Sequence, residues 1–410
     1  MGAGITEKRR LAVAGRREFI AGMAGIASFN IMRPAVALGS EQNSKIELGM
    51  IGCGGRGTWI APLFLDNGPY QFVACADYFP EKSATFGEKF SISAERRFST
   101  MSGAKRLLEG KLDAVVIESP PFLHPEHTAD SIAAGKHAFV AKPIAVDVPG
   151  CMAFQETGRR ATEKGLVVLV DFQARANALF REAAKRVLNG DIGKLVCGEA
   201  FNHAGGGGPI DVDDSDPEFR LRHWGRYRAL SGDFITEQAV HALDMATWFI
   251  ESEPIEAEGR GGRKARLGRG DNYDHFSVRY VFPGDVLLTF SGTQVTRAVP
   301  GGYEIAARWF GSSGLVDTLY NGPVSIRGDM PFRGGETGNL YTEGAVANIR
   351  DFVELVRAKD ASNPTVAPSV RSTLVTILGR MAAYRRATVT WKQMMEERER
   401  LDPALKGLKA

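Results

Sequence analysis

Three side chains of this sequence could move protons between an alcohol and a carbonyl. Lys142 stands between a short apolar run and a proline, and Glu237 and His241 lie four residues apart. That spacing predicts that Glu237 and His241 share one face of a helix. Asp244, three residues later, could orient the imidazole. An ammonium, a carboxylate and an imidazole around one sugar hydroxyl would suit proton transfer as a hydride leaves its carbon.

A nucleotide-binding loop lies upstream of these groups. Gly52, Gly54 and Gly57 form a G-x-G-x-x-G pattern after an apolar run, and Asp77 follows Gly57 by about twenty residues. In this context the pattern is typical of dinucleotide binding, with the pyrophosphate at a helix N-terminus. Asp77 can accept hydrogen bonds from both ribose hydroxyls and would repel a 2′-phosphate, which favours NAD over NADP. A plain glycine turn is the alternative. The cofactor candidates here are Gly52, Gly54, Gly55, Arg56, Gly57 and Asp77.

The elements around this loop alternate between strand and helix. Apolar runs that predict strands cover residues 46–51, 72–76, 113–117 and 137–140, with helical patterns between them. Such alternation predicts a doubly wound parallel sheet with helices on both faces. Ligands of these sheets bind at the carboxyl ends of the strands, and Lys142 lies at one of these ends.

The second half of the sequence predicts further strands and two long helices. Period-two patterns indicate strands at 199–203, 274–282, 286–293 and 303–310, and amphipathic helices are expected at 343–358 and 368–386. The stretch 220–228 interleaves aromatic and basic residues, which suits a sugar; a solvated turn with Trp224 packed inward is the alternative. For Arg175 a structural salt bridge is the alternative. The tentative substrate-binding residues are Arg175, His203, His223, Trp224 and Tyr227.

Taken together, these motifs resemble the glucose–fructose oxidoreductase, inositol dehydrogenase and rhizopine-catabolism (Gfo/Idh/MocA) family. The resemblance covers about residues 44–385 and implies an NAD-binding Rossmann domain, then an α+β domain with an open-faced, mostly antiparallel sheet. It also implies that Lys142 and His241 are acid/base groups and that Lys142 adjoins the cofactor. By the same resemblance, Pro120, Leu123 and His124 lie along the dinucleotide. The motifs that carry it are the glycine loop with Asp77, residues 120–124, 135–137, 142–143 and 191–194, and the Glu237/His241/Asp244 set.

Two positions depart from the family pattern. Ala141 stands where the family usually has glutamate, and Glu237 replaces the usual aspartate. Without a carboxylate at position 141, Lys142 loses a partner that would favour its charged form. Lys142 would then act mainly as a hydrogen-bond donor, and the placement of the substrate need not match that in other members.

The N-terminal segment has the layout of a twin-arginine export signal. Arg16 and Arg17 precede the apolar stretch 19–31, which is short for a membrane span, and a small-x-small site ends at Ala37. An uncleaved lipid-facing anchor, a disordered basic leader and an interfacial helix are the alternatives. We expect export of the folded protein by the twin-arginine machinery, without a permanent membrane anchor. The expected parts are a signal (1–37), a Rossmann domain (44–170), a substrate and oligomerisation domain (171–385) and a C-terminal tail (386–410).

Composition argues against several classes of function. The chain has a formal net charge of +3, and the basic excess lies within residues 1–37, so nucleic-acid binding has no electrostatic support in the remainder. Four scattered cysteines predict neither a disulfide framework nor a metal site. The open face of the sheet expected in the second domain suggests that the protein forms a homo-oligomer.

The sequence therefore predicts an exported NAD-dependent oxidoreductase that acts on a carbohydrate or polyol with a tightly bound cofactor. One alternative is an NAD-dependent glycosidase, in which the sugar is oxidised transiently at C3, loses the aglycone by β-elimination, adds water and is re-reduced. Another is a noncatalytic sugar-binding protein, against which the Lys142 and His241 pair argues, because binding alone needs no proton-transfer groups.

Overall fold

The computed structural model describes residues 45–205, 215–266, 268–295 and 303–410. The proposed export signal, most of the glycine-rich and acidic loop 205–216 and the glycine pair 301–302 lie outside the described residues. None of the described helices combines the length and apolar character that a membrane span requires.

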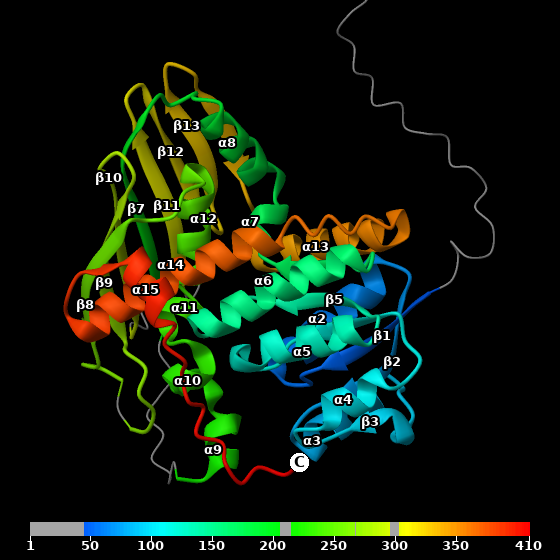
Figure 1. Ribbon diagram of the computed structural model, residues 1–410. Coiled ribbons are helices and arrows are strands. Elements are labelled where there is room, and N and C mark those ends of the chain that lie inside the picture. Colours follow the sequence, from blue (N-terminus) through cyan, green and yellow to red (C-terminus); the bar gives the residue numbers. More distant parts are fainter. Residues whose placement is uncertain (1–44, 206–214, 267, 296–302) are drawn as a thin grey trace, which may run out of the picture. The chain divides into compact units, whose positions relative to one another are not determined.

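The first half of the described chain forms a six-stranded parallel sheet in the order β3-β2-β1-β4-β5-β6 (Figure 1). All four residues of β4 are buried, as expected for a parallel strand covered on both faces. The doubly wound sheet predicted from the sequence is confirmed. Its strands are β1 (Ile46–Ile51), β2 (Tyr70–Ala76), β3 (Arg97–Phe98), β4 (Ala114–Ile117), β5 (His137–Ala141) and β6 (Val168–Asp171). Its helices are α2 (Gly55–Asn67), α3 (Pro80–Lys89), η1 (Ala94–Arg96), α4 (Gly103–Leu108), η2 (Pro121–Leu123), α5 (His124–Ala133) and α6 (Val148–Glu163).

The second half forms a nine-stranded sheet in the order β14-β13-β12-β11-β7-β10-β9-β8-β15. Its neighbouring strands are antiparallel except for β7 and β10, which run parallel. This confirms the mostly antiparallel second sheet. Its strands are β7 (Leu195–Ala204), β8 (Glu256–Gly262), β9 (His275–Phe282), β10 (Val286–Gln294), β11 (Tyr303–Gly311), β12 (Gly314–Leu319), β13 (Pro323–Gly328), β14 (Phe332–Glu336) and β15 (Val389–Thr390).

Helices cover one face of this second sheet, and α8, α12 and α14 lie against it in Figure 1. Along β7, Gly198, Ala200 and Asn202 are buried, whereas Glu199, which alternates with them, is exposed on the other face. This face is therefore open in the single chain, and the site must lie on the helical side. The remaining helices are α7 (Gln173–Ala176), α8 (Ala178–Leu188), α9 (Pro217–Arg222), η3 (Trp224–Arg226), α10 (Arg228–Ser231), α11 (Phe234–Glu237), α12 (Val240–Ile250), α13 (Leu340–Ala358), α14 (Val366–Arg385) and α15 (Trp391–Glu397).

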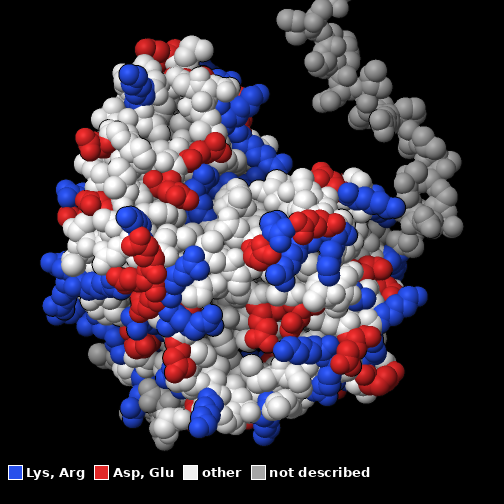
Figure 2. Space-filling model, viewed as in Figure 1, with Lys and Arg blue, Asp and Glu red and all other residues white. Residues whose placement is uncertain are grey.

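Charged side chains are mixed over the face drawn in Figure 2. Lysine and arginine alternate there with aspartate and glutamate, and this face carries no extended surface of one sign. Such a surface offers no continuous track for a phosphate backbone.

Candidate active site

The three catalytic candidates line one cleft between the carboxyl ends of the parallel strands and the helical side of the second sheet. Lys142 follows β5, Glu237 ends α11 and His241 is the second residue of α12. The volume of the cleft is about 370 Å³, which is within the range of small-molecule sites. Its lining residues are Arg56, Glu118, Ser119, Pro121, His124, Ala141, Lys142, Trp224, Glu237, Gln238, His241, Gln294, Tyr303, Ile305, Tyr320 and Tyr341.

Glu237 and His241 do not share one continuous helix, so that prediction was wrong. α11 ends at Glu237, α12 begins at Val240, and Gln238 and Ala239 form a turn between them. The amide of His241 donates to the carbonyl of Gln238 across this turn. The helix break still places both side chains on the cleft, where they approach from separate elements.

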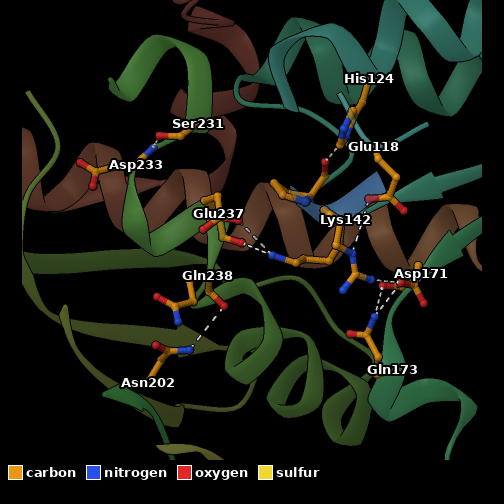
Figure 3. A network of polar contacts seen from close by, with 12 residues as sticks. Glu118, His124, Lys142, Asp171, Gln173, Asn202, Ser231, Asp233, Glu237 and Gln238 are labelled. Carbon is orange, nitrogen blue, oxygen red and sulfur yellow. Dashed lines mark hydrogen bonds and ion pairs between the residues drawn. The ribbon is translucent and has the colours of Figure 1, made fainter. Parts of the chain in front are cut away.

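Lys142 has a carboxylate partner despite the alanine at position 141. Its Nζ atom donates to the carbonyl oxygen of Glu237 at 2.5 Å and forms an ion pair with Glu237 Oε1 at 3.3 Å (Figure 3). The two side chains are 16% and 29% exposed. The two departures from the family pattern therefore compensate, because the longer side chain at 237 supplies the carboxylate that Ala141 lacks.

The imidazole of His241 is held by packing. Its ring lies 5.2 Å from the ring of Tyr320 and 6.1 Å from that of Phe172, centroid to centroid. Burial lowers the pKa of His241 well below its ordinary value, and the positive charges of Lys142 and Arg56 lower it further. His241 is therefore neutral near pH 7 and can accept a proton from a hydroxyl in the cleft.

Asp244 does not orient this imidazole, so that prediction was also wrong. Both of its carboxylate oxygens accept from Arg175, at distances of 2.8 to 3.0 Å between guanidinium nitrogens and oxygens. No hydrogen bond joins Asp244 to His241 within the described residues. Arg175 is taken up by this buried pair and by the ring of Trp248 and does not line the cleft. These contacts therefore support a structural salt bridge as the role of Arg175.

A buried polar cluster fixes the turn that carries Glu237. Asp233 accepts at Oδ1 from the amide of Phe234, and at Oδ2 from the hydroxyl of Tyr384. From α14, Arg380 donates to the carbonyls of Gly232 and Val146, which lie in the segments that carry Glu237 and Lys142. One buried guanidinium thereby ties together the two segments that supply the ion pair.

A row of side chains at the ends of β4, β5 and β6 was missed by sequence reasoning. Ile117 pairs with Val140 and Ala141 with Asp171, so Glu118, Ala141 and Asp171 follow one another across three strands. The guanidinium of Arg56 forms ion pairs with both Glu118 and Asp171. Only the strand register reveals the row, because its members are far apart in sequence.

Asp171 links this row to the other side of the cleft. Its Oδ2 atom accepts from Gln173 Nε2 at 2.7 Å, and its Oδ1 atom accepts from Asn348. The Oε1 atom of Gln173 accepts in turn from the hydroxyl of Tyr320, the residue that packs on His241. A chain of polar contacts therefore runs from Arg56 of the glycine loop to Tyr320, whose ring packs on the proposed base.

Glu118 is buried in this row. Its side chain has no exposed area, and neither carboxylate oxygen has a hydrogen-bond partner within the described residues, although Arg56 Nε lies 3.4 Å from Oε2. Burial raises the pKa of Glu118 to about 7; Arg56 and Lys142 oppose this shift, and Asp171 adds to it. Glu118 therefore changes protonation near neutral pH.

Replacing Glu118 by glutamine should change how stability depends on pH. The pKa of Glu118 rises from 4.5 to about 7 on folding, so the folded state binds the proton more tightly. The free energy of unfolding should then fall between pH 4.5 and 7 by a few kcal/mol at most, and this fall should be absent in E118Q. Thermal melts of both proteins from pH 5 to 8 measure the difference. If stability depended on pH in the same way in both proteins, the raised pKa of Glu118 would be contradicted. E258Q, which changes an exposed ion pair, is the control.

The glycine loop fits a dinucleotide. A Cβ atom at Gly52 would lie 2.5 Å from the backbone of Glu118, and one at Gly57 would lie 2.1 Å from the carbonyl oxygen of Gly52. A Cβ at Gly54 or Gly55 would meet no atom within 4 Å. The first pair therefore allows the tight turn and the packing of helix on strand, while the second pair leaves open the space that a pyrophosphate would approach.

Two alanine variants of this loop should lose different properties, stability in one and NAD affinity in the other. Gly57→Ala should lower the free energy of unfolding by about 1–3 kcal/mol, because its methyl group has no room. Gly54→Ala should fold with an unchanged melting temperature but lose NAD affinity by about tenfold or more, because its methyl group faces the pyrophosphate space. Calorimetric melts and NADH fluorescence titration check both. Equal NAD affinity in Gly54→Ala and the native protein would contradict this placement of the cofactor.

Asp77 lies at the end of β2 in a second cleft, which adjoins the first. Its carboxylate accepts from the amides of Cys53 and Phe79, which aims it along the glycine loop, and burial raises its pKa. The two clefts share Glu118, Ser119 and Trp224. The second cleft is lined by Ile51, Gly52, Gly54, Ala76, Asp77, Tyr78, Phe79, Lys82, Thr100, Met101, Ala104, Glu118, Ser119, Pro120, Leu123, His127, Leu221 and Trp224.

The residues that the resemblance placed along a dinucleotide lie in these clefts. Pro120 and Leu123 line the Asp77 cleft, and His124 lines the Lys142 cleft. The ring nitrogens of His124 lie 2.7 Å from the carbonyl oxygens of Pro143 and Ser119. His124 thereby joins the loop after β4 to the segment that carries Lys142.

The tentative substrate residues are dispersed, and of these only Trp224 lines the clefts. His203 stacks on Phe201 and alternates with the buried residues of β7, so it lies on the open face of the sheet. His223 packs on Phe219, and Tyr227 is buried beneath Arg220. The cleft-lining residues that sequence reasoning missed are Gln238, Gln294, Tyr303, Tyr320 and Tyr341.

Comparisons with known proteins agree with this arrangement. Residues 46–172 match the GFO/IDH/MocA model described as an oxidoreductase family with an NAD-binding Rossmann fold, and residues 180–317 match the C-terminal domain model of the same family. The inositol 2-dehydrogenase of Rhizobium meliloti is 25% identical over 352 residues, which cover 83% of this chain and 96% of that protein.

Two further comparisons broaden the range of activities among similar proteins. The 2,7-anhydro-N-acetylneuraminate hydratase of Mediterraneibacter gnavus is 25% identical over 236 residues, which cover 57% of each chain. A levoglucosan dehydrogenase solved with NADH and L-sorbose superimposes with a TM-score of 0.69 at 17% identity, covering 85% of this chain and 99% of that one.

Proposed function

Because the chain belongs to the Gfo/Idh/MocA oxidoreductase family, we propose that it is an NAD-dependent oxidoreductase acting on a hydroxyl of a neutral carbohydrate or polyol. The observation that carries the proposal is the convergence of Lys142 and His241 on the cleft that adjoins the glycine loop. The similarity to an inositol 2-dehydrogenase supports a polyol as substrate.

The charges of the cleft favour an uncharged substrate. Lys142 is paired with Glu237, and Arg56 is paired with Asp171 and Glu118. No other lysine, arginine, aspartate or glutamate lines this cleft within the described residues. A carboxylate or phosphate on the substrate would therefore have to displace an existing ion pair, whereas hydroxyl groups would meet donors and acceptors on every side.

Two side chains, His241 and Lys142, would assist the transfer of the hydroxyl proton from the substrate. When bound, NAD would accept a hydride from the carbinol carbon of the substrate. His241, neutral because of its burial, would accept the hydroxyl proton, while Lys142 would donate a hydrogen bond to the same oxygen and stabilise its developing negative charge. Glu237 would hold the ammonium of Lys142 in place.

A redox-neutral reaction is the second candidate. The similarity to a hydratase, a protein whose name describes no net redox change, favours it. In that case the same cleft would oxidise C3 of a glycoside transiently, and the acidified proton at C2 would leave with elimination of the aglycone. Addition of water to the unsaturated ketone and return of the hydride to C3 would then complete a hydrolysis without net oxidation.

The two candidates differ in their products. We would incubate the protein with aryl glycosides and, separately, with free sugars and polyols. Release of the aryl group without accumulation of NADH would establish the redox-neutral reaction. A keto-sugar whose formation depends on an added acceptor would establish the dehydrogenase. If the NAD-loaded protein transformed neither class, the proposed substrate class would be overturned.

We also propose that the twin-arginine segment exports the protein with its cofactor already bound. Outside the cytoplasm little fresh NAD is at hand, so a bound cofactor would have to be regenerated in place by a second substrate or by return of the hydride. A fusion of residues 1–44 to a reporter that folds before export tests the signal. Export that persists after replacement of Arg16 and Arg17 by lysine would overturn it.

A further inference from the structure

We propose that the C-terminal segment 398–410, here named the strap, and helix α9 close over the adenosine half of the dinucleotide cleft and retain the cofactor between turnovers. This inference rests on the proposed NAD-dependent function. The strap lies beyond both regions that match the family models, so it is not part of the matched family pattern. In Figure 1 the C-terminus lies beside α3, next to the first sheet.

The strap ends on two residues that line the Asp77 cleft. The amide of Met101 donates to the carbonyl of Lys409 at 3.1 Å, and the amide of Lys409 donates to the hydroxyl of Tyr78 at 3.2 Å. Met101 and Tyr78 lie on opposite sides of β3 in the sequence, in the loops before α4 and α3. The strap therefore joins two walls of the cleft.

Helix α9 closes the same cleft from the second half of the chain. Leu221 and Trp224 line the cleft together with Asp77. Glu218 accepts from the hydroxyl of Tyr78 at 2.9 Å. Arg222 forms an ion pair with Glu81 at 2.9 Å, and its guanidinium lies 3.9 Å from the ring centroid of Phe79. Helix α9 is thus held against α3 by polar and cation–π contacts.

The strap and α9 also hold one another. Lys409 Nζ lies 3.6 Å from Glu218 Oε1, and Arg220 donates to the carbonyl of Pro403. At its start the strap is anchored through Leu401, which is buried and whose amide donates to Asp147 Oδ2. The hydroxyl of Tyr78 is the common point, because it contacts both the strap and α9. Release of an adenosine held beside Asp77 would require several of these contacts to open.

Two variants test the strap. The first ends at Asp402 and keeps the Leu401 anchor; the second is Tyr78→Phe, which keeps the aromatic wall but removes the hydroxyl. We expect the rate of NADH dissociation to rise about 10- to 100-fold in the first and about three- to tenfold in the second, as expected for loss of several hydrogen bonds or of two. Stopped-flow fluorescence during displacement by excess NAD, and the NAD retained after gel filtration, are the readouts.

A control variant separates the strap from general destabilisation. Arg327→Ala removes an exposed ion pair on the second sheet and should leave the dissociation rate unchanged. Lys409→Ala is a mild variant of the strap: it removes the exposed ion pair with Glu218 but keeps both main-chain contacts of residue 409, so the rate should rise less than twofold. If the chain that ends at Asp402 does not fold, the NADH dissociation rate of Tyr78→Phe alone tests the strap.

The outcomes distinguish the strap from the proposed function. Full-length protein that binds no NAD would overturn both. Full-length protein that binds NAD, with dissociation rates unchanged in the folded variants, would overturn the strap and leave the proposed function standing. Faster dissociation in Tyr78→Phe, at an unchanged melting temperature, would support the strap.

Discussion

Lys142→Ala should lower turnover by about 10²- to 10⁴-fold, the range in which positioned acid/base groups contribute. The ammonium of Lys142 is fixed by two contacts to Glu237, at 2.5 and 3.3 Å, and it lines the cleft beside His241. Removing it would take away the donor that stabilises the substrate oxygen as its proton leaves. The loss should appear in kcat, while the affinity for NADH should change little, because the pyrophosphate space lies over Gly54 and Gly55.

Two further variants isolate this effect. Lys136→Ala removes another partly buried lysine, whose Nζ donates to the carbonyl of Leu112 away from the cleft, and should keep nearly full turnover. Lys142→Ala also leaves the carboxylate of Glu237 without its ion-pair partner. The double variant Lys142→Ala/Glu237→Gln removes this unpaired charge together with the ammonium. Near-native turnover of Lys142→Ala with bound NAD would show that another group stabilises the substrate oxygen.

His241→Ala should also lower turnover by about 10²- to 10⁴-fold and should respond to added imidazole. The ring is buried and packed against Tyr320 and Phe172, so its removal leaves a cavity at the position of the proposed base. A small base that fills this cavity should restore part of the activity. Substitution of His275, which is partly exposed and paired with Asp274, is the control and should have little effect.

The pH profile of the native enzyme provides an independent check on His241. Burial and two neighbouring cations lower the pKa of this imidazole well below 6.5. Its neutral, proton-accepting form should therefore persist as the pH falls through 6.5, and the acid limb of kcat should lie below that value. An acid limb above pH 6.5 that disappears in His241→Ala would contradict the predicted environment of His241, and full turnover of His241→Ala would remove it from the mechanism.

Four strands of the first sheet (β1, β2, β4 and β5) could be predicted because apolar residues dominate them, whereas the short β3 and β6 were not predicted. β4 is a continuous apolar run, and β1 is apolar apart from Glu47 and Gly49. This local signal needs no knowledge of the rest of the chain. β8 and β14 were missed because they are rich in glycine and charged residues. Their extended form depends on pairing with β9 and β13, which is a long-range property.

The site could be predicted only where its members are adjacent in sequence or matched a known pattern. Lys142, Glu237 and His241 were placed together, but the turn that divides α11 from α12 falls within a mostly apolar stretch and leaves no clear signal. The bond between Asp244 and Arg175 joins residues 69 apart. The compensation of Ala141 by Glu237, and the row of Glu118 and Asp171, likewise follow from packing between distant segments.

The description of the C-terminal residues 386–410 as a tail was incomplete. This segment contains β15 and α15 and then the strap. The run of charged residues at 396–400 is typical of a solvated end. Main-chain hydrogen bonds at Leu401 and Lys409 decide the position of the strap instead, and such contacts do not depend on side-chain pattern.

Transfer of a deuteride within the loaded protein would test the central claim most directly. The NAD-loaded protein would be mixed with polyols and glycosides deuterated at their carbinol carbons, and the nucleotide would be released by denaturation and weighed by mass spectrometry. We predict that deuterium appears on the nicotinamide with at least one neutral carbohydrate, and that Lys142→Ala and His241→Ala suppress its appearance. A protein that holds NAD but never transfers deuterium from any of these compounds would contradict the account.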